Sequence, residues 1–165
     1  MRAIEADILV KKPTKRVWKS LASLGYCRTL TDSFWRFGRN LKYSVTHPKG
    51  VAPPKDAETL TPGTHIAVTT GFSRPWIDWV VSESVKEEVL VLRAERPGWL
   101  DGYVMVIRSE LEVIDDEKCR LNVKLFVIFL NRGLELASLF LPLTFLYRMC
   151  IVSAIKKTKN AIERT

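Results

Sequence analysis

The most constraining feature of the sequence is a pair of segments, at about 103–114 and 119–130, in which apolar and polar residues alternate. Alternation with a period of two places the apolar side chains on one face of a β-strand and the polar ones on the other. Only the charged residues 115–118 separate the two segments, which predicts an antiparallel hairpin with one buried face. The side chains expected on that face are Tyr103, Met105, Ile107, Ser109, Leu111, Val113, Leu121, Val123, Leu125, Val127 and Phe129.

The hydrophobic period changes to helical from Gly133 onward. We expect a long helix that runs to about Glu163, with a kink at Pro142, and whose first half is apolar on most sides. Such a helix can cover the apolar face of the sheet. The longest apolar run, 136–147, is too short to span a membrane.

Shorter elements precede the hairpin. A strand at 3–12 is followed by a helix that begins near Thr14 and ends at Gly25, and by a second short helix after Thr31 or Asp32. Four further strands are expected, at 41–46, 64–72, 77–85 and 89–96. This order indicates an α+β fold, and a chain of 165 residues fits one domain that comprises residues 1–165.

The positive charge is concentrated in the first third of the chain. Residues 1–50 carry 11 basic and 3 acidic residues, whereas the rest of the chain carries 15 of each, which leaves a net charge of +8. A basic surface with interleaved aromatic residues can meet anionic lipid headgroups or nucleic acid. The alternative is a solvated basic face whose aromatic residues turn inward. The candidate residues of the basic surface are Lys15, Arg16, Lys19, Arg36 and Arg39.

The sequence lacks the motifs that are typical of several enzyme classes. It contains no P-loop, no Gly-x-Ser-x-Gly and no dinucleotide-binding motif. The two histidines, His47 and His65, have no carboxylate at a suitable spacing, so we expect neither a metal nor a cofactor. The three cysteines are far apart in the sequence and form no Cys-x-x-Cys pair, which is typical of free thiols in a cytoplasmic protein.

The order of elements resembles the helix-grip fold of the START-like superfamily, which includes polyketide cyclase/dehydrase-like and lipid-transfer proteins. Ile8-Leu9-Val10, followed by Pro13 and Val17-Trp18-Lys19-Ser20-Leu21, is similar to the opening strand and helix start of that family. Pro62-Gly63 before a strand also fits, and the resemblance covers essentially the whole chain. It implies a curved antiparallel sheet of about seven strands wrapped around the long C-terminal helix, with two short helices after the first strand.

The resemblance also implies an apolar cavity between the sheet and the C-terminal helix. The Pro-rich segment 47–63 is expected to be a long loop, and together with the aromatic segment 34–37 it either gates this cavity or is passive surface. The candidate lining residues are Tyr103, Met105, Ile107, Leu125, Val127, Phe129, Phe140, Thr144 and Tyr147. The alternative is that these side chains simply form the core.

Three functions follow from this interpretation. The one we favour is non-enzymatic binding or carriage of an apolar small molecule, lipid or isoprenoid-like, with exchange at an anionic membrane. The second is a cyclase/dehydrase-type enzyme acting on a polyketide-like or aromatic substrate, with Tyr103 or Glu83 as the acid. Glu83 faces inward if it shares a face with Trp79 and Val81. If Ser82 and Ser84 face inward instead, which is the alternative we favour, Glu83 is merely solvated. The third is a basic module that contacts RNA or a protein through Lys15, Arg16, Arg36 and Arg39, for which nucleic acid is the less favoured partner.

Overall fold

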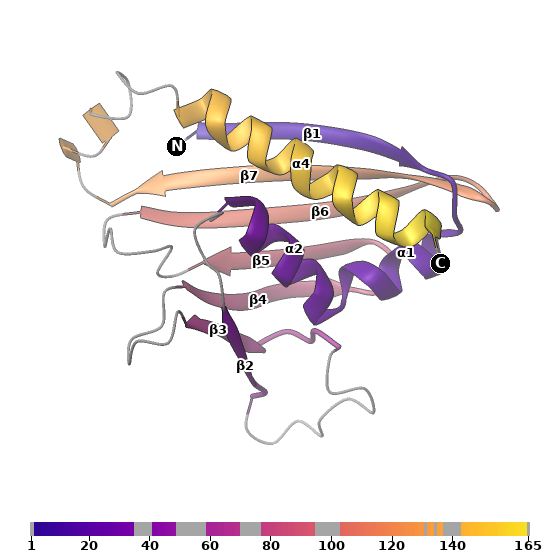
Figure 1. The fold of residues 1–165 in the computed structure, drawn as a ribbon, viewed down its shortest axis with the longest axis horizontal. Helices are drawn as coiled ribbons and strands as arrows, with labels where there is room; N and C mark the ends of the chain where they lie inside the picture. Colours follow the sequence, from indigo (N-terminus) through magenta and orange to yellow (C-terminus); the bar gives the residue numbers. More distant parts are fainter. Residues whose placement is uncertain are drawn as a thin grey trace.

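Figure 1 shows the fold of the chain in a computed structural model. It describes residues 2–34, 41–48, 59–69, 77–94, 103–130, 132–133, 135–136 and 143–164. The elements are β1 (Arg2–Val10), α1 (Thr14–Leu21), α2 (Leu24–Phe34), β2 (Lys42–Thr46), β3 (His65–Thr69), β4 (Ile77–Val85), β5 (Val89–Ala94), β6 (Tyr103–Asp115), β7 (Lys118–Phe129) and α4 (Leu143–Arg164). This order confirms the expected α+β fold with two short helices after the first strand.

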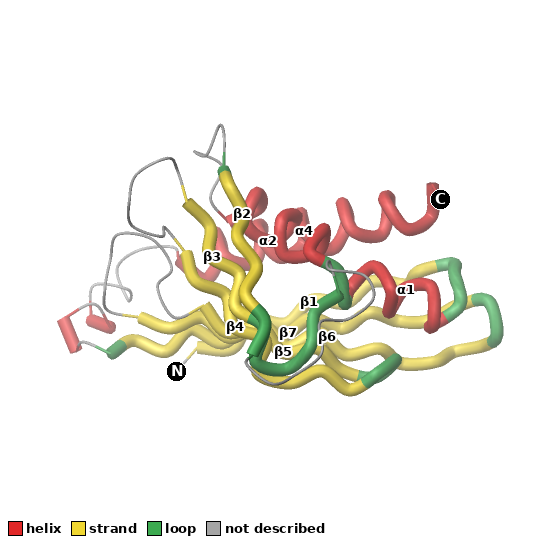
Figure 2. Tube along the Cα trace, turned by 90° about the horizontal axis from the view of Figure 1, so that it is seen from below, coloured by secondary structure: helices red, strands yellow, loops and turns green. Residues whose placement is uncertain are grey.

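The strands form one antiparallel sheet of seven strands, in the order β1-β7-β6-β5-β4-β3-β2. Strands β2 to β7 therefore follow one another as neighbours, and β1 is added at the edge beside β7. The sheet is curved, and α1, α2 and α4 all lie on its concave side (Figure 2). This is the helix-grip architecture that the sequence resembles.

The β6–β7 hairpin has the two faces that its alternation predicts. The register pairs Met105 with Val127 and Ile107 with Leu125, and all four side chains are buried. The hairpin end differs from the prediction, because Val113 is 66% exposed. There the register shifts between Val113 and Asp115, and the two strands extend past the helices (Figure 1).

The bounds predicted for the two short helices are wrong. α1 ends at Leu21, and α2 begins at Leu24, so that Gly25 lies in the first turn of α2 instead of terminating α1. The second helix was expected to begin after Thr31 or Asp32, but α2 begins at Leu24, about two helical turns earlier. The junction between the helices is held by the segment that precedes β3, since the Leu60 amide donates to the Ala22 carbonyl over 2.8 Å.

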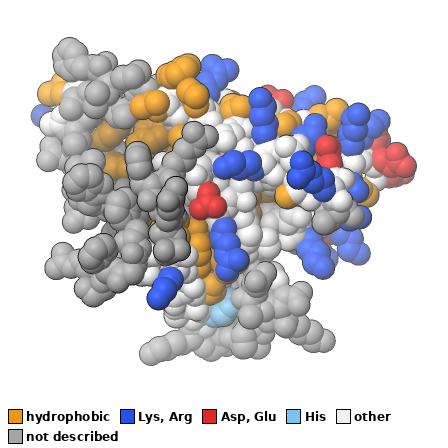
Figure 3. All heavy atoms as spheres, viewed as in Figure 1, with side chains coloured by type: hydrophobic (Ala, Val, Ile, Leu, Met, Phe, Trp, Pro, Cys, Tyr) orange, Lys and Arg blue, Asp and Glu red, His pale blue; other side chains and the backbone are white. Residues whose placement is uncertain are grey.

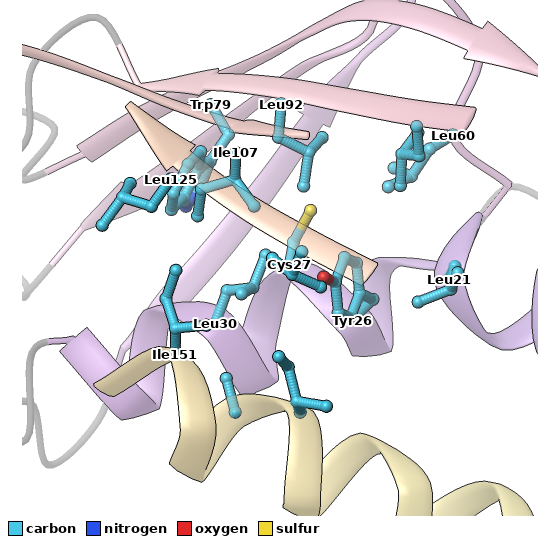
Figure 4. Packing of buried hydrophobic residues seen from close by; sticks show 14 of the residues in the cluster. Leu21, Tyr26, Cys27, Leu30, Leu60, Trp79, Leu92, Ile107, Leu125 and Ile151 are labelled. Atoms are coloured by element: carbon cyan, nitrogen blue, oxygen red, sulfur yellow. The ribbon is translucent and has the colours of Figure 1, made fainter. Parts of the chain in front are cut away.

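Helix α2 covers the centre of the sheet, whereas the C-terminal helix alone was expected to do so. Its residues Tyr26, Cys27 and Leu30 are buried, and their side chains lie close to those from the central strands (Figure 4). Tyr26 Oη and Ser109 Oγ are hydrogen-bonded at 2.8 Å, in a buried position. The neighbouring polar contact is Trp79 Nε1, which donates to Thr31 Oγ1 over 3.1 Å.

Helix α4 packs against β1 and α2 (Figure 1). Ile151, Ala154, Ile155 and Ile162 form its buried side. Its last turn is tied to the end of β1 by the Lys11 amide, which donates to Glu163 Oε1 over 2.9 Å. Pro142, where a kink is expected, lies outside the described residues. Within the described ranges, no helix has both the length and the hydropathy that crossing a membrane requires.

Candidate functional site

Four of the candidate cavity residues lie in the middle of the sheet. Met105, Ile107 and Leu125 have no accessible surface, and Val127 has 1%. They belong to the same apolar cluster as Leu30 of α2. These four side chains are therefore part of the packed core. Met105, Ile107 and Leu125 border no space that water could enter.

The aromatic candidates lie at one end of the sheet and are only half-buried. Tyr103 is the first residue of β6, Phe129 is the last residue of β7, and Tyr147 lies in the first turns of α4. Tyr103 and Phe129 have ring centroids 6.2 Å apart. Tyr147 is 6.2 Å from Phe34, the last residue of α2, by the same measure. We refer to Phe34, Tyr103, Phe129 and Tyr147 as the aromatic cluster.

The phenols of Tyr103 and Tyr147 are close enough for a side-chain hydrogen bond, and this contact links the two ring pairs. Burial is the main cause that raises the pKa of both phenols. The contact between the two phenols adds to the rise in the pKa of Tyr103 and opposes the rise in the pKa of Tyr147. The aromatic cluster therefore contains two neutral phenols. Its four rings come from α2, α4, β6 and β7.

Two further candidates come from the segment that leads into α4. Phe140 lies outside the described residues. Thr144 is in the first turn of α4, and its side chain is likewise outside the description. Both stay predictions.

Glu83 lies on the outer face of the sheet. A register shift between Val81 and Glu83 interrupts the alternation of β4, so Glu83 does not share the face of Trp79 and Val81. Its exposed carboxylate is 3.4 Å from Arg108 Nη1. The bulge explains why strict alternation places this residue incorrectly, and the geometry corresponds to the solvated alternative.

The histidines lie near one another at the ends of β2 and β3. His47 Nδ1 is 3.4 Å from Thr64 Oγ1, and His65 Nδ1 is 3.8 Å from an oxygen of Asp78. Among the residues that the structure describes, no group of three His, Cys, Asp or Glu side chains is placed to hold a metal ion.

The basic residues Lys15, Arg16 and Lys19 are exposed on α1, and Arg36 and Arg39 lie outside the described residues. The end of the Pro-rich segment packs against the core, where Leu60 is buried. Gly63 adopts a φ of +81°, and a Cβ on it would lie 3.3 Å from the Pro48 ring, so a glycine fits this turn best.

The hydrogen bonds of α2 could not be found from sequence patterns. Tyr26 and Ser109 are 83 positions apart, and Thr31 and Trp79 are 48 apart. The only available signal was the expected inward position of Ser109 in an otherwise apolar row. A polar residue at such a position needs a buried partner, which the pattern does not identify.

No protein-family model and no curated protein sequence matches this chain. Solved structures do. Norcoclaurine synthase from Thalictrum flavum, in complex with dopamine and hydroxybenzaldehyde, has a TM-score of 0.60 at 13% identity, over 99% of this chain and 88% of that one. A protein of Mesorhizobium loti has a TM-score of 0.62 at 11% identity, over 99% and 98% of the two chains. A START superfamily protein from Mycobacterium smegmatis has a TM-score of 0.59 at 10% identity, over 98% and 97%. The fold is therefore START-like.

Proposed function

We propose that the chain binds an apolar small molecule between the sheet and the C-terminal helix, at the aromatic cluster, and serves as a binder or carrier. The observation that carries this proposal is the half-buried state of four aromatic side chains from four separate elements. Half-buried aromatic rings retain apolar surface that a ligand can remove from water, at about 25 cal/mol per Å². The fully packed residues beside them, such as Met105, would form the floor of this site.

The phenol pair favours a ligand that is mostly apolar and has one oxygen. Two phenols that share one hydrogen bond use only one of their two O–H groups for it, so the other O–H can be directed at a ligand. A carbonyl or hydroxyl oxygen on the ligand would accept from it. Lipids and isoprenoid-like compounds with a polar end meet this requirement, and small aromatic carbonyl compounds do so too.

The comparison with solved structures is compatible with this class of ligand. Norcoclaurine synthase is similar in fold and was solved with dopamine and hydroxybenzaldehyde, which are small aromatic molecules. The likeness concerns the fold, and fold alone does not transfer a ligand. The proposal for this chain rests on its own aromatic cluster.

We place this carrier in the cytoplasm, where its free cysteines Cys27, Cys119 and Cys150 would stay reduced. Its exposed basic residues on α1, Lys15, Arg16 and Lys19, would approach anionic lipid headgroups during exchange.

A second function, acid catalysis, is favoured by one observation. Burial raises the pKa of Tyr103, which keeps its phenol protonated at neutral pH beside the aromatic rings. With its O–H turned from Tyr147 toward the substrate, such a phenol can donate a hydrogen bond to a carbonyl oxygen as negative charge develops on it. Turnover of an aromatic carbonyl compound that is lost in Tyr103→Phe, while binding is retained, would distinguish an enzyme from a carrier.

Binding of Nile red, a neutral apolar dye, tests the proposed site with a matched pair of variants. Phe129 belongs to the aromatic cluster, whereas Phe126 lies on the opposite face of the same strand. We expect Phe129→Ala to weaken dye binding several-fold and Phe126→Ala to leave it unchanged. Circular dichroism of both variants checks that the fold persists. Equal dye binding by the two variants would contradict a site at the aromatic cluster.

A further inference from the structure

Helix α4 carries an exposed apolar surface on the side away from the core. Phe145 is 63% exposed, Leu146 48% and Met149 55%. Exposed large apolar side chains that gather in one place mark an interaction surface more often than scattered ones do. These three lie within five consecutive residues of one helix.

A groove of about 590 Å³ runs along this surface. Its lining residues are Phe145, Arg148, Met149, Val152, Ser153 and Lys156. Phe145, Met149, Val152 and Lys156 follow at intervals of four, three and four residues, which places them in one row along the helix. Among the lining residues that the structure describes, the two charged ones, Arg148 and Lys156, are basic. Figure 3 shows apolar side chains beside Lys and Arg side chains on the face of the molecule that carries α4.

We propose that this face of α4 docks on an anionic lipid bilayer, with Phe145, Leu146 and Met149 inserted at the level of the headgroups and with Arg148 and Lys156 paired with lipid phosphates. A helix with protruding apolar side chains flanked by basic ones is suited to the interface between headgroups and acyl chains. This inference deepens the proposed function and rests on it, since a carrier of an apolar ligand needs a surface where the ligand is exchanged.

A second copy of the chain fits this face less well. A symmetric contact would bring the Arg148 and Lys156 side chains of two copies together, and each copy has a net charge of +8. An anionic bilayer offers charge that is complementary to both residues. It also accepts side chains that protrude, whereas a protein partner would need recesses shaped to receive them.

The docking face and the proposed ligand site lie on opposite sides of α4. Tyr147 is two residues after Phe145, which places the two side chains on nearly opposite sides of the helix. Tyr147 packs with the aromatic cluster while Phe145 is exposed. A membrane bound through Phe145 would therefore contact the same turns of α4 that border the ligand site, which is where exchange would take place.

Vesicle flotation tests the docking face directly, with the intact protein and two lipid compositions. We expect binding to vesicles of phosphatidylcholine and phosphatidylglycerol at low salt, and much weaker binding to phosphatidylcholine alone. Lys156→Ala should weaken binding about fivefold, since one basic residue near the surface contributes about 1 kcal/mol. The double variant Phe145→Ser with Met149→Ser should weaken it at least as much.

Matched controls come from surfaces that point elsewhere. Val113→Ser removes an equally exposed apolar side chain at the β6–β7 turn, and Lys86→Ala removes an exposed lysine at the β4–β5 turn. Both should bind vesicles as the parent chain does. Equal loss in the controls, no binding to anionic vesicles, or a dimer that the double variant abolishes would each overturn the proposal. Nile red binding of the docking variants is measured in parallel; it should be unchanged, and its loss would count against the ligand site instead.

Discussion

The phenol of Tyr103, the first residue of β6, and the phenol of Tyr147, in the first turns of α4, are close enough for a side-chain hydrogen bond. This contact joins the sheet to the C-terminal helix at the end where the aromatic cluster lies. Elsewhere the centre of the sheet is covered by α2, with Tyr26 and Thr31 bonded to strand residues. The aromatic cluster therefore adds a contact between α4 and the sheet to the packing of α4 against β1.

Removing one phenol oxygen should weaken the contact between β6 and α4 without creating a cavity. We expect Tyr103→Phe to lower the free energy of unfolding by about 0.5–1.5 kcal/mol, the usual net contribution of one hydrogen bond. Urea unfolding of Tyr103→Phe, Tyr147→Phe and the double variant measures the coupling between the two residues. Strictly additive effects of the two single variants would show that the hydroxyl groups do not interact.

Tyr26 and Ser109 should behave as a buried polar pair. Tyr26→Phe leaves the Ser109 hydroxyl without its partner in the core, which should cost about 1–3 kcal/mol of stability. Because removing both polar groups also removes the unpaired one, Tyr26→Phe with Ser109→Ala should be less destabilised than the sum of the single changes. Thermal unfolding of the three variants tests this, and a double variant as unstable as the sum would contradict the pairing.

The outer face of the sheet should make stability depend on pH in the acid range. Glu110 Oε1 accepts a hydrogen bond from Arg108 Nε over 2.6 Å, and this bond holds the pKa of the carboxyl below its ordinary value. A lowered folded-state pKa stabilises the protein above the unfolded value of about 4.3, and this contribution is lost as the pH falls through the folded-state value.

The difference in unfolding free energy between the parent chain and Glu110→Gln should thus be largest near neutral pH and should vanish in strong acid. Because Arg108 and Glu110 are partly exposed, we expect a difference of about 1 kcal/mol or less. Urea unfolding across this range measures the difference. Asp116→Asn, in the β6–β7 turn, is the control for loss of a surface carboxyl. A constant difference at every pH would contradict the assigned cause.

The three cysteines should react with a thiol reagent at very different rates. Cys27 and Cys119 are buried, and burial raises the pKa of both thiols, whereas Cys150 is half-buried. We expect one thiol to react with Ellman's reagent in the folded protein, and the other two to react only after unfolding. Cys150→Ser should remove the fast reaction. A fast reaction that persists in this variant would show that the packing around Cys27 or Cys119 opens readily.

Most of the β-sheet could be predicted from the alternation of apolar and polar residues and from the turn residues that interrupt it. The charged residues between Val113 and Cys119 and the strict alternation on both sides define the β6–β7 hairpin, because a one-residue slip would turn every apolar side chain outward. Alternation is interrupted where a bulge inserts a residue, so the sequence left two alternatives for the face on which Glu83 lies.

The helices after β1 were harder to place, because their ends depend on tertiary contacts. Ser23 pairs with Thr59 in an isolated β-bridge, and this contact with a distant segment separates α1 from α2. The burial of Cys27, Leu30 and Thr31 follows from the sheet beneath them, which a local pattern does not contain. Tyr103, Phe129 and Tyr147 were three of nine candidate lining residues, and only the structure separates them from the packed side chains in the middle of the sheet.

The most direct test of the proposed function is native mass spectrometry of the gently purified protein, followed by solvent extraction. We predict an added mass of a few hundred daltons that is lost on denaturation, is extracted as an apolar compound with an oxygen-bearing end, and is reduced in Phe129→Ala but not in Phe126→Ala. A bound mass that is hydrophilic, or one retained equally by both variants, would contradict a ligand site at the aromatic cluster. A parent chain that remains free of ligand after incubation with lipid extract would contradict the carrier function itself.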